Sequence, residues 1–217
     1  MVIMDSLGGF AHYPDVCEIF CDGKFVRECG AYGLVGGRVF DLKSGYDFDD
    51  EAVQTECEEY LDEHEPWLVI GSPECKAHSQ LQNLHEDSPN YAETYNRCLR
   101  HLKFCCRMYE KQVTGGRLFL HEHPFGATSW MEQCGQELLG LNNVYDMWGT
   151  PEELVVYYGD QCYFQDKPVQ IKNEAGYIKK PTGWLTNSKF IGMQLYKHCP
   201  QDHEHINLVG YIAHHAE

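Results

Sequence analysis

The chain has 217 residues, a formal net charge of -16 and an ordinary globular composition, with 43% hydrophobic and 23% charged residues. This is enough chain for one good-sized domain, and no apolar run approaches the roughly 20 residues that span a bilayer, so we expect no membrane partner. The negative charge disfavours a protein that holds nucleic acid by itself, because phosphate contacts from Lys and Arg supply much of that affinity.

Strands and helices are predicted to alternate in the first part of the chain. In order, we expect a strand over residues 16–20, a helix over 24–32, a strand over 38–42, a helix to about 63 and a strand over 67–70. Gly33 can end the first helix, and Asp49 or Asp50 can cap the second. The last of these strands is continuously apolar, as in a strand buried on both faces.

The alternation continues in the second part. Apolar residues recur at helical spacing over residues 91–109, and Gly115-Gly116 ends that helix. A strand over residues 117–120 follows. Ser129-x-x-Glu132 has the pattern of a capping box that opens a helix through residue 139. Two further strands are predicted, over residues 154–158 and 183–186.

Alternating strands and helices predict an α/β fold with a mostly parallel, twisted sheet flanked by helices. In such sheets, ligands bind beyond the carboxyl ends of the strands. Phe20, Asp41, Cys75 and Glu122 all lie at or just past a predicted strand end. The sequence therefore predicts a site at that edge of the sheet.

Two short segments carry the predicted chemistry. One is Gly71-Ser72-Pro73-Glu74-Cys75-Lys76-Ala77-His78-Ser79, and the other is Glu122-His123-Pro124. A cysteine after one strand and a carboxylate at the end of a later strand suit covalent attack on an electron-poor ring. These segments resemble those of the DNA cytosine methyltransferases that modify ring carbon 5, especially the compact phage type. In that family, a strand leads into Pro-Pro-Cys and a later strand ends in Glu-Asn-Val or Glu-Asn-Pro.

Other segments add to the resemblance in the same order along about residues 16–205. Glu18-Ile19-Phe20-Cys21-Asp22-Gly23 is similar to the Glu-Leu-Phe-x-Gly of the family, and Lys180-Pro181-Thr182-Gly183-Trp184-Leu185-Thr186-Asn187 to its Lys-Pro-Thr-x-x-x-Thr-Asn. The resemblance implies a Rossmann-like methyltransferase fold that uses S-adenosylmethionine. It implies that the cofactor is held by Phe20, Asp22, Gly23, Asp41, Asp47, Ser72 and Pro73.

The resemblance also implies a reaction. Cys75 would attack cytosine carbon 6, and Glu122, protonated or sharing a proton, would bond the ring nitrogen and exocyclic amine. The target base would leave the DNA stack, with Trp130 or Phe125 as candidates to stack on it. Given the net charge, a separate DNA-recognition or basic partner is expected beside DNA itself.

The expected organisation is a single domain over residues 1–217, with a core over 16–190 and a tail over 191–217. It leaves no room for a full target-recognition domain. A non-catalytic binding or scaffold module, from a transposon-type polyprotein, is the alternative. The net charge favours that alternative, and so does Asp22, whose side chain stands where the family has a glycine.

Metal binding is a third hypothesis. Cys199, His203 and His205, with Cys162 as a further candidate, have the ligand types of a zinc site. The simpler interpretation, a tail with solvated histidines and no metal, is the one we adopt from the sequence. We also predict no metal at His121 and His123, although alternate strand positions put them on one face.

Cysteine usage bears on the compartment. The chain has 11 cysteines, and an odd count with the adjacent pair Cys105-Cys106 inside a helical pattern disfavours a disulfide framework. Residues 1–10 show no basic region before an apolar one, so we expect no signal peptide. The sequence therefore predicts an intracellular protein of the cytoplasm or nucleus.

Overall fold

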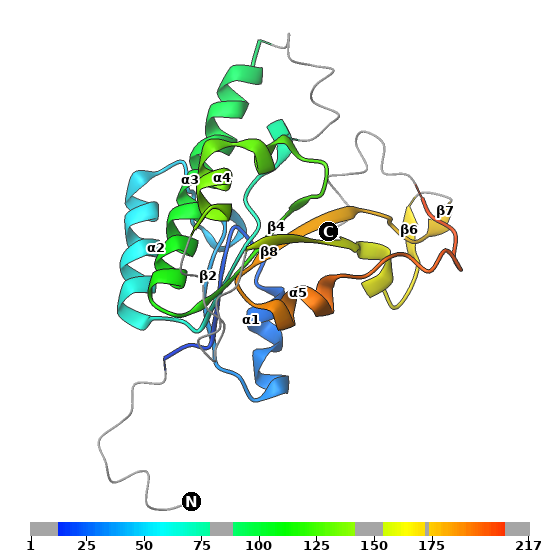
Figure 1. Ribbon diagram of the computed structural model, residues 1–217, viewed down its shortest axis with the longest axis horizontal. Coiled ribbons are helices and arrows are strands. Elements are labelled where there is room, and N and C mark those ends of the chain that lie inside the picture. Colours follow the sequence, from blue (N-terminus) through cyan, green and yellow to red (C-terminus); the bar gives the residue numbers. More distant parts are fainter. Residues whose placement is uncertain (1–12, 79–88, 142–153, 172–173, 207–217) are drawn as a thin grey trace, which may run out of the picture.

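The structure is a computed structural model that describes residues 13–78, 89–141, 154–171 and 174–206. A six-stranded sheet in the order β2-β1-β3-β4-β8-β5 forms its centre (Figure 1). The strands are β1 (Val16–Ile19), β2 (Gly36–Phe40), β3 (Leu68–Gly71), β4 (Leu118–Pro124), β5 (Val155–Asp160) and β8 (Pro181–Thr186). A separate two-stranded sheet consists of β6 (Val169–Ile171) and β7 (Glu174–Gly176).

Helices connect these strands. They are α1 (Lys24–Glu28), α2 (Glu51–His64), α3 (Tyr91–Thr114), α4 (Gln133–Leu139) and α5 (Lys189–Leu195). Short 3-10 turns are η2 (Cys29–Tyr32), η3 (Leu42–Ser44), η4 (Lys76–His78), η6 (Thr128–Met131) and η7 (Gln161–Phe164). Among the described helices, none is both long and apolar enough to cross a bilayer.

The sheet is mostly parallel, as predicted. Strands β2, β1, β3 and β4 pair in parallel, whereas β8 pairs antiparallel with both β4 and β5. The described chain between β5 and β8 contains η7 and the β6–β7 pair instead of a crossover helix. Because a parallel return needs such a crossover, the chain comes back antiparallel there. The α/β prediction is confirmed, and β8 is the strand whose direction it did not anticipate.

Two layers of helices cover the sheet. The larger core lies between the sheet and helices α2, α3 and α4, and it includes Phe104, Tyr109, Phe119 and Leu138. The smaller core lies on the other face, where α1 and α5 pack on Ile70 and Leu120 (Figure 1). The sheet is therefore buried on both faces, which explains the continuous apolar run predicted for β3.

A close approach fixes the end of β3. A Cβ atom built on Gly71 would lie 2.0 Å from the hydroxyl oxygen of Tyr109, which is fully buried on α3. Only glycine leaves room for that hydroxyl. Tyr109 in turn lies 3.1 Å from Nδ1 of His121 on β4. The strand that leads into the cysteine turn is thus packed tightly against α3 and β4.

The helix caps test two sequence predictions. The carboxylate of Asp50 accepts a hydrogen bond from the Ala52 backbone N–H at 2.8 Å, so the predicted cap of α2 is confirmed. The predicted capping box is wrong, because α4 begins only at Gln133 with no side-chain cap. Ser129 lies in η6, where its hydroxyl bonds His123, and Glu132 accepts from the Tyr95 hydroxyl. Partners outside the helix therefore outcompete the local cap.

Candidate functional site

The carboxyl ends of the four parallel strands meet at one edge of the sheet. The register pairs Ile19 with both Phe40 and Gly71, and it pairs Gly71 with His121. The next residues along the strands are therefore aligned at this edge, and they are Phe20, Asp41, Ser72 and Glu122. The predicted convergence of the site residues at the strand ends is confirmed at the level of the backbone.

Glu122 is the most strongly bound of these groups. Its Oε2 accepts a hydrogen bond from the Ser72 hydroxyl at 2.6 Å, and its Oε1 accepts one from the Lys180 ammonium at 3.1 Å. The Glu122 side chain is 13% exposed, whereas that of Lys180 is 40% exposed. The carboxylate is thus held between the end of β3 and the start of β8.

The contact with Lys180 was not anticipated, although the residue opens one of the segments that carry the resemblance. Strand β8 runs antiparallel to β4 and pairs Thr182 with Pro124. The beginning of one strand therefore lies beside the end of the other, and Lys180 reaches back to Glu122. Only the direction of β8 supplies this information, and the prediction of a mostly parallel sheet did not specify that direction.

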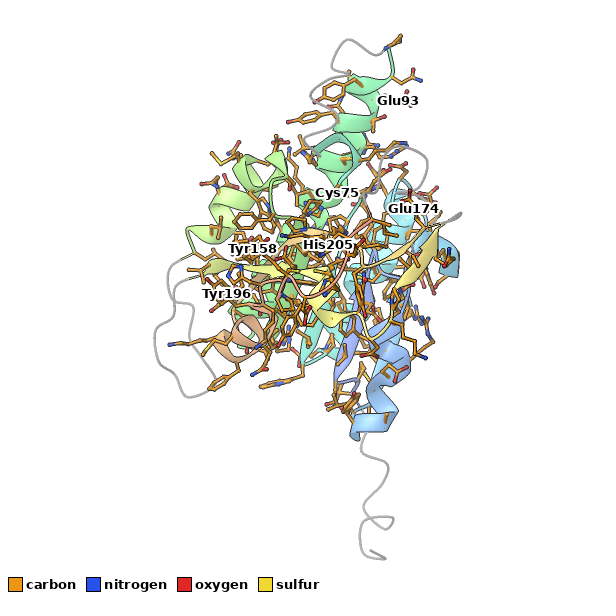
Figure 2. All side chains as sticks on the ribbon, turned by 90° about the vertical axis from the view of Figure 1, so that its right-hand side faces the viewer. Cys75, Glu93, Tyr158, Glu174, Tyr196 and His205 are labelled. Carbon is orange, nitrogen blue, oxygen red and sulfur yellow. The ribbon has the colours of Figure 1, made fainter. Side chains whose placement is uncertain are left out.

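Cys75 lies in the turn after β3, half-buried and just before η4 (Figure 2). Burial raises the pKa of its thiol, the Lys180 cation lowers the pKa, and the Glu122 carboxylate raises it. Lys180 and Glu122 are therefore the principal charged neighbours of the sulfur. The structure brings the two predicted catalytic residues to the same edge, where Lys180 and Glu122 act on the thiol in opposite directions.

His123 holds the cysteine turn in place. Its Nε2 lies 2.9 Å from the Pro73 carbonyl oxygen, which can only accept, so Nε2 carries the proton. Nδ1 then accepts from the Ser129 hydroxyl at 2.6 Å. Burial lowers the pKa of His123 to about 4, so the ring is neutral near pH 7. The histidine is a positioning residue for the turn, a role that the sequence did not reveal.

Glu74 turns its charge away from the cysteine that follows it. Its Oε2 accepts hydrogen bonds from the Arg97 guanidinium of α3 at 2.9 and 3.1 Å. A free carboxylate beside a thiol would raise the thiol pKa. The ion pair therefore offsets a charge that would otherwise oppose ionisation of Cys75.

The turn after β1 is conformationally unusual. Phe20 has a φ of 55°, a left-handed value that costs a non-glycine residue about 1 kcal/mol or more. Its ring stacks on Phe48 with centroids 4.0 Å apart. Gly23 has a φ of 82°, where glycine is favoured. Strained backbone of this kind is concentrated at ligand sites, although the Phe20 ring already uses one face against the core.

Asp22 lies between these two residues. Its carboxylate is 3.4 Å from the Lys24 ammonium, and its backbone carbonyl accepts from Arg27 at 2.7 Å. The side chain is thus directed toward α1. This orientation lessens the obstruction that a side chain at the usual glycine position would cause, but it leaves a negative charge in the turn.

Glu18 on β1 binds the backbone of α1, the helix that follows the same turn. The residue is 1% exposed, and its Oε2 accepts from the Val26 backbone N–H at 2.8 Å. Burial raises the pKa of this carboxyl group, while the α1 backbone N–H groups lower it. An acid within an apolar strand is a sequence signal for such a role, but no role was predicted for Glu18.

The two remaining acids of the predicted cofactor set lie in the loop after β2. Asp41 directly follows the strand, and its Oδ1 accepts from the Lys43 N–H at 2.9 Å. Asp47 is farther along, and its Oδ1 accepts from the Asp49 N–H at 3.0 Å. The structure therefore brings Asp41 to the sheet edge, whereas Asp47 makes a local turn contact ahead of α2.

The aromatic candidates do not join Glu122. His121 and His123 alternate with Glu122 along β4 and so face the opposite side of the sheet. The Trp130 ring packs edge-on against both histidines, with centroids 5.5 and 6.1 Å away. Phe125 lies edge-on to Tyr158. The expectation that Trp130 lines the base pocket is therefore wrong, because its ring fills the core behind the strand.

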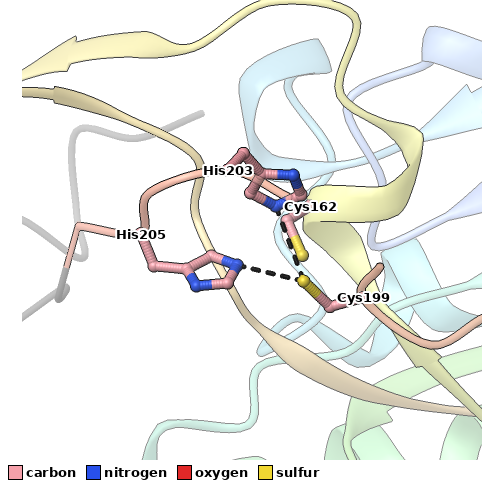
Figure 3. A group of neighbouring side chains, drawn as sticks. All are labelled: Cys162, Cys199, His203 and His205. Carbon is pink, nitrogen blue, oxygen red and sulfur yellow. Dashed lines mark hydrogen bonds between the residues drawn. The ribbon is translucent and has the colours of Figure 1, made fainter. Parts of the chain in front are cut away.

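A second group of chemically active side chains begins just beyond the end of β5, where the Gln161 backbone N–H donates to the Lys180 carbonyl oxygen at 3.2 Å. Cys162, Cys199, His203 and His205 place one ligand atom each within 4.8 Å of one another (Figure 3). Cys162 and Cys199 are buried, and the histidines are half-buried instead of solvated. All eleven cysteines of the chain are described, and each is a free thiol. Ser79 and the end of the predicted tail, 207–217, lie outside the described residues.

No protein-family model matches the chain, and no curated protein is significantly similar to it in sequence.

Proposed function

We propose that the chain is a methyltransferase-fold protein that attacks an extruded cytosine through Cys75 and methylates ring carbon 5. The observation that carries the proposal is the meeting of Ser72, Cys75, Glu122 and Lys180 beyond the ends of parallel strands. Ligands of open α/β sheets bind at this place. The identity of the reaction rests on the resemblance of these segments to cytosine methyltransferases.

The residues would divide the chemistry as follows. Cys75 would lose its proton and form a bond from sulfur to ring carbon 6, which pushes an electron pair into the ring and makes carbon 5 nucleophilic. Glu122 would bond the ring nitrogen and the exocyclic amine through a proton shared with its neighbours. Lys180 would keep positive charge beside both groups as negative charge develops. Release of the carbon 5 proton and of the thiolate would restore the ring.

S-adenosylmethionine, when bound, would supply the methyl group. Asp41 at the end of β2 offers a carboxylate to the ribose hydroxyls, and the turn from Phe20 to Gly23 offers the backbone that approaches the cofactor. Asp22 is the residue that counts against this fit. Its replacement by glycine is expected to strengthen cofactor binding, whereas Asp41→Asn is expected to weaken it by about tenfold.

The test is covalent trapping. DNA that contains 5-fluorocytosine, supplied with S-adenosylmethionine, should remain bonded to the protein. Release of the thiolate requires removal of a proton from carbon 5, and in this base fluorine replaces that proton. Mass spectrometry should place the bond on Cys75, and Cys75→Ala should abolish it. Cys29→Ala, which removes a buried cysteine outside the sheet edge, is the matched control. A wild-type protein that binds both ligands without forming an adduct would contradict the proposed catalysis.

A non-catalytic binding or scaffold module is the second candidate, and specific observations favour it. The net charge of -16 opposes DNA binding without a separate DNA-recognition or basic partner, and burial raises the pKa of the Cys75 thiol. Calorimetry with S-adenosylmethionine separates the two candidates. If neither the wild type nor Asp22→Gly takes up the cofactor, only the scaffold function stands. Under either proposal, the protein acts inside the cell, in the cytoplasm or nucleus.

A further inference from the structure

The group formed by Cys162, Cys199, His203 and His205 has a geometry of its own. Nε2 of His205 lies 3.3 Å from the Cys199 sulfur, and Nε2 of His203 lies 3.6 Å from the same atom (Figure 3). In a tetrahedral zinc site with bonds of about 2.3 Å to sulfur and 2.0 Å to nitrogen, these atoms are about 3.5 Å apart. The observed spacings match that value.

The neighbouring polar groups prepare these atoms as ligands. Nδ1 of His203 is 2.9 Å from the Asp202 carboxylate, which can only accept, so Nδ1 carries the proton and Nε2 presents its lone pair. The Cys199 sulfur accepts from the Gln201 backbone N–H at 3.3 Å. A carboxylate behind a histidine and a backbone donor toward a thiolate are the outer contacts that orient metal ligands.

The four side chains come from separate parts of the fold. Cys162 lies in η7 directly after β5, Cys199 follows α5, and the histidines lie beside Tyr177 after β7. Hydrogen bonds already tie these parts together. The Asp160 carboxylate accepts from the Cys199 backbone N–H at 2.9 Å, and the Tyr177 backbone donates to the Glu204 carbonyl and accepts from the Ile206 N–H. The ligand atoms are therefore held by a fixed framework.

We propose that Cys162, Cys199, His203 and His205 bind one zinc ion in a closed structural site that fastens the C-terminal segment to η7 and the β6–β7 pair. Two thiolates and two imidazoles favour zinc among the common divalent ions. Four protein ligands leave no open position, so the site is structural. The inference does not rest on the proposed methyl transfer, because it follows from the spacing of the four ligand atoms, whatever reaction takes place at Cys75.

Metal content of the full chain is the first test. Protein purified under reducing conditions with zinc in the medium, then desalted, should contain about one zinc per chain. His205→Gln and Cys199→Ser should each lose it. His198→Gln, a change to the neighbouring histidine that stacks on Tyr158, is the control and should keep it. Asp202→Asn should keep the metal but weaken its affinity, by about tenfold.

Cobalt substitution guards against variants that fail to fold. Cobalt added to metal-free wild-type protein should give the ligand-field absorption of a tetrahedral site with two thiolates, and zinc should displace it. His205→Gln should change the spectrum without loss of secondary structure. The inference is overturned if the purified chain holds no stoichiometric metal and gives no such spectrum, or if intact mass shows a disulfide between Cys162 and Cys199. Equal zinc content in the wild type and Cys199→Ser would overturn it as well.

Discussion

The sheet-edge site and the C-terminal cluster both contain cysteine beside groups that can ionise, but the two places are organised differently. At the edge, Glu122 receives hydrogen bonds from Ser72 and Lys180, and the charges of Lys180 and Glu122 act on the nearby Cys75 thiol. In the cluster, two imidazole nitrogens point at the sulfur of Cys199. A thiol beside two opposite charges suits reaction, whereas four converging ligand atoms suit a bound ion.

The difference also concerns how each place is supported. The edge depends on strand register and on His123, whose two ring nitrogens bond Pro73 and Ser129. The cluster depends on contacts among segments that follow β5, β7 and α5. A change that damages the edge should therefore leave metal content intact, and a change that removes the metal should leave the His123 contacts in place.

The largest expected effect is on the reaction at the edge. Glu122→Gln keeps the shape of the side chain but removes its charge and its shared proton. We expect the methyl-transfer rate to fall by about 100- to 1000-fold, the usual cost of losing one stabilising group. The rate would be followed by transfer of labelled methyl groups to DNA. Glu137→Gln on α4 is the control, and Glu122→Gln at more than half the wild-type rate would contradict the assigned role.

The next effect is a dependence of stability on pH. The pKa of His123 is about 4 in the folded chain against an ordinary value of 6.5, because burial disfavours the charged ring. Between these values the unfolded chain binds more protons. The contribution of neutral His123 to the free energy of unfolding is therefore complete above about pH 6.5. It is lost as the pH falls toward 4, by an amount on the order of 3 kcal/mol.

Urea unfolding at a series of pH values measures this contribution. His123→Gln should reduce the slope of the unfolding free energy against pH between 6.5 and 4 by about one proton. Burial also lowers the pKa of His121, so part of the slope should remain. An identical slope in the wild type and the variant would mean that His123 is not buried as a neutral ring.

A smaller effect concerns the ionisation of Cys75. The Lys180 cation lowers the pKa of the thiol, so Lys180→Met should raise it and reduce the thiolate fraction at neutral pH. Alkylation of Cys75 by iodoacetamide, followed by peptide mass spectrometry, should slow by about three- to tenfold. Lys179→Met is the matched control, because that lysine acts on Asp160 and Cys162 instead. Equal rates in both variants would disprove the influence of Lys180.

The reach of the sequence differs between the two places for a physical reason. The strand ends at Phe20, Asp41 and Glu122 could be predicted because parallel strands carry their carboxyl ends to one edge, whatever the register. The contact of Lys180 could not, since it follows from the antiparallel direction of β8. The approach of Cys162 to Cys199 also needs the tertiary fold, because local spacing specifies neither partner.

The helix prediction at Ser129 went wrong for a related reason. Ser-x-x-Glu is a local pattern, but the Ser129 hydroxyl finds the buried ring of His123 and the Glu132 carboxylate finds Tyr95. A buried imidazole needs a hydrogen-bond partner more than a solvent-exposed helix end does, because the helix end can bond water. The local pattern correctly predicted that a helix follows, but it did not predict the hydrogen-bond partners of Ser129 and Glu132.

The smallest expected effect comes from the ion pair between Glu74 and Arg97, and it can still discriminate. Both side chains are about one-third exposed, at 36% and 34%, so the pair contributes less than about 1 kcal/mol to stability. Arg97→Met and Arg100→Met should therefore unfold alike in urea, since Arg100 makes a similar pair with Asp49.

Only Arg97→Met leaves a free carboxylate beside Cys75, and like charge disfavours a thiolate. Alkylation of Cys75 in Arg97→Met at low salt should be about two- to threefold slower than in Arg100→Met, and high salt should remove the difference. Equal alkylation in both arginine variants at low salt would show that Glu74 does not act on the thiol even when it is unpaired.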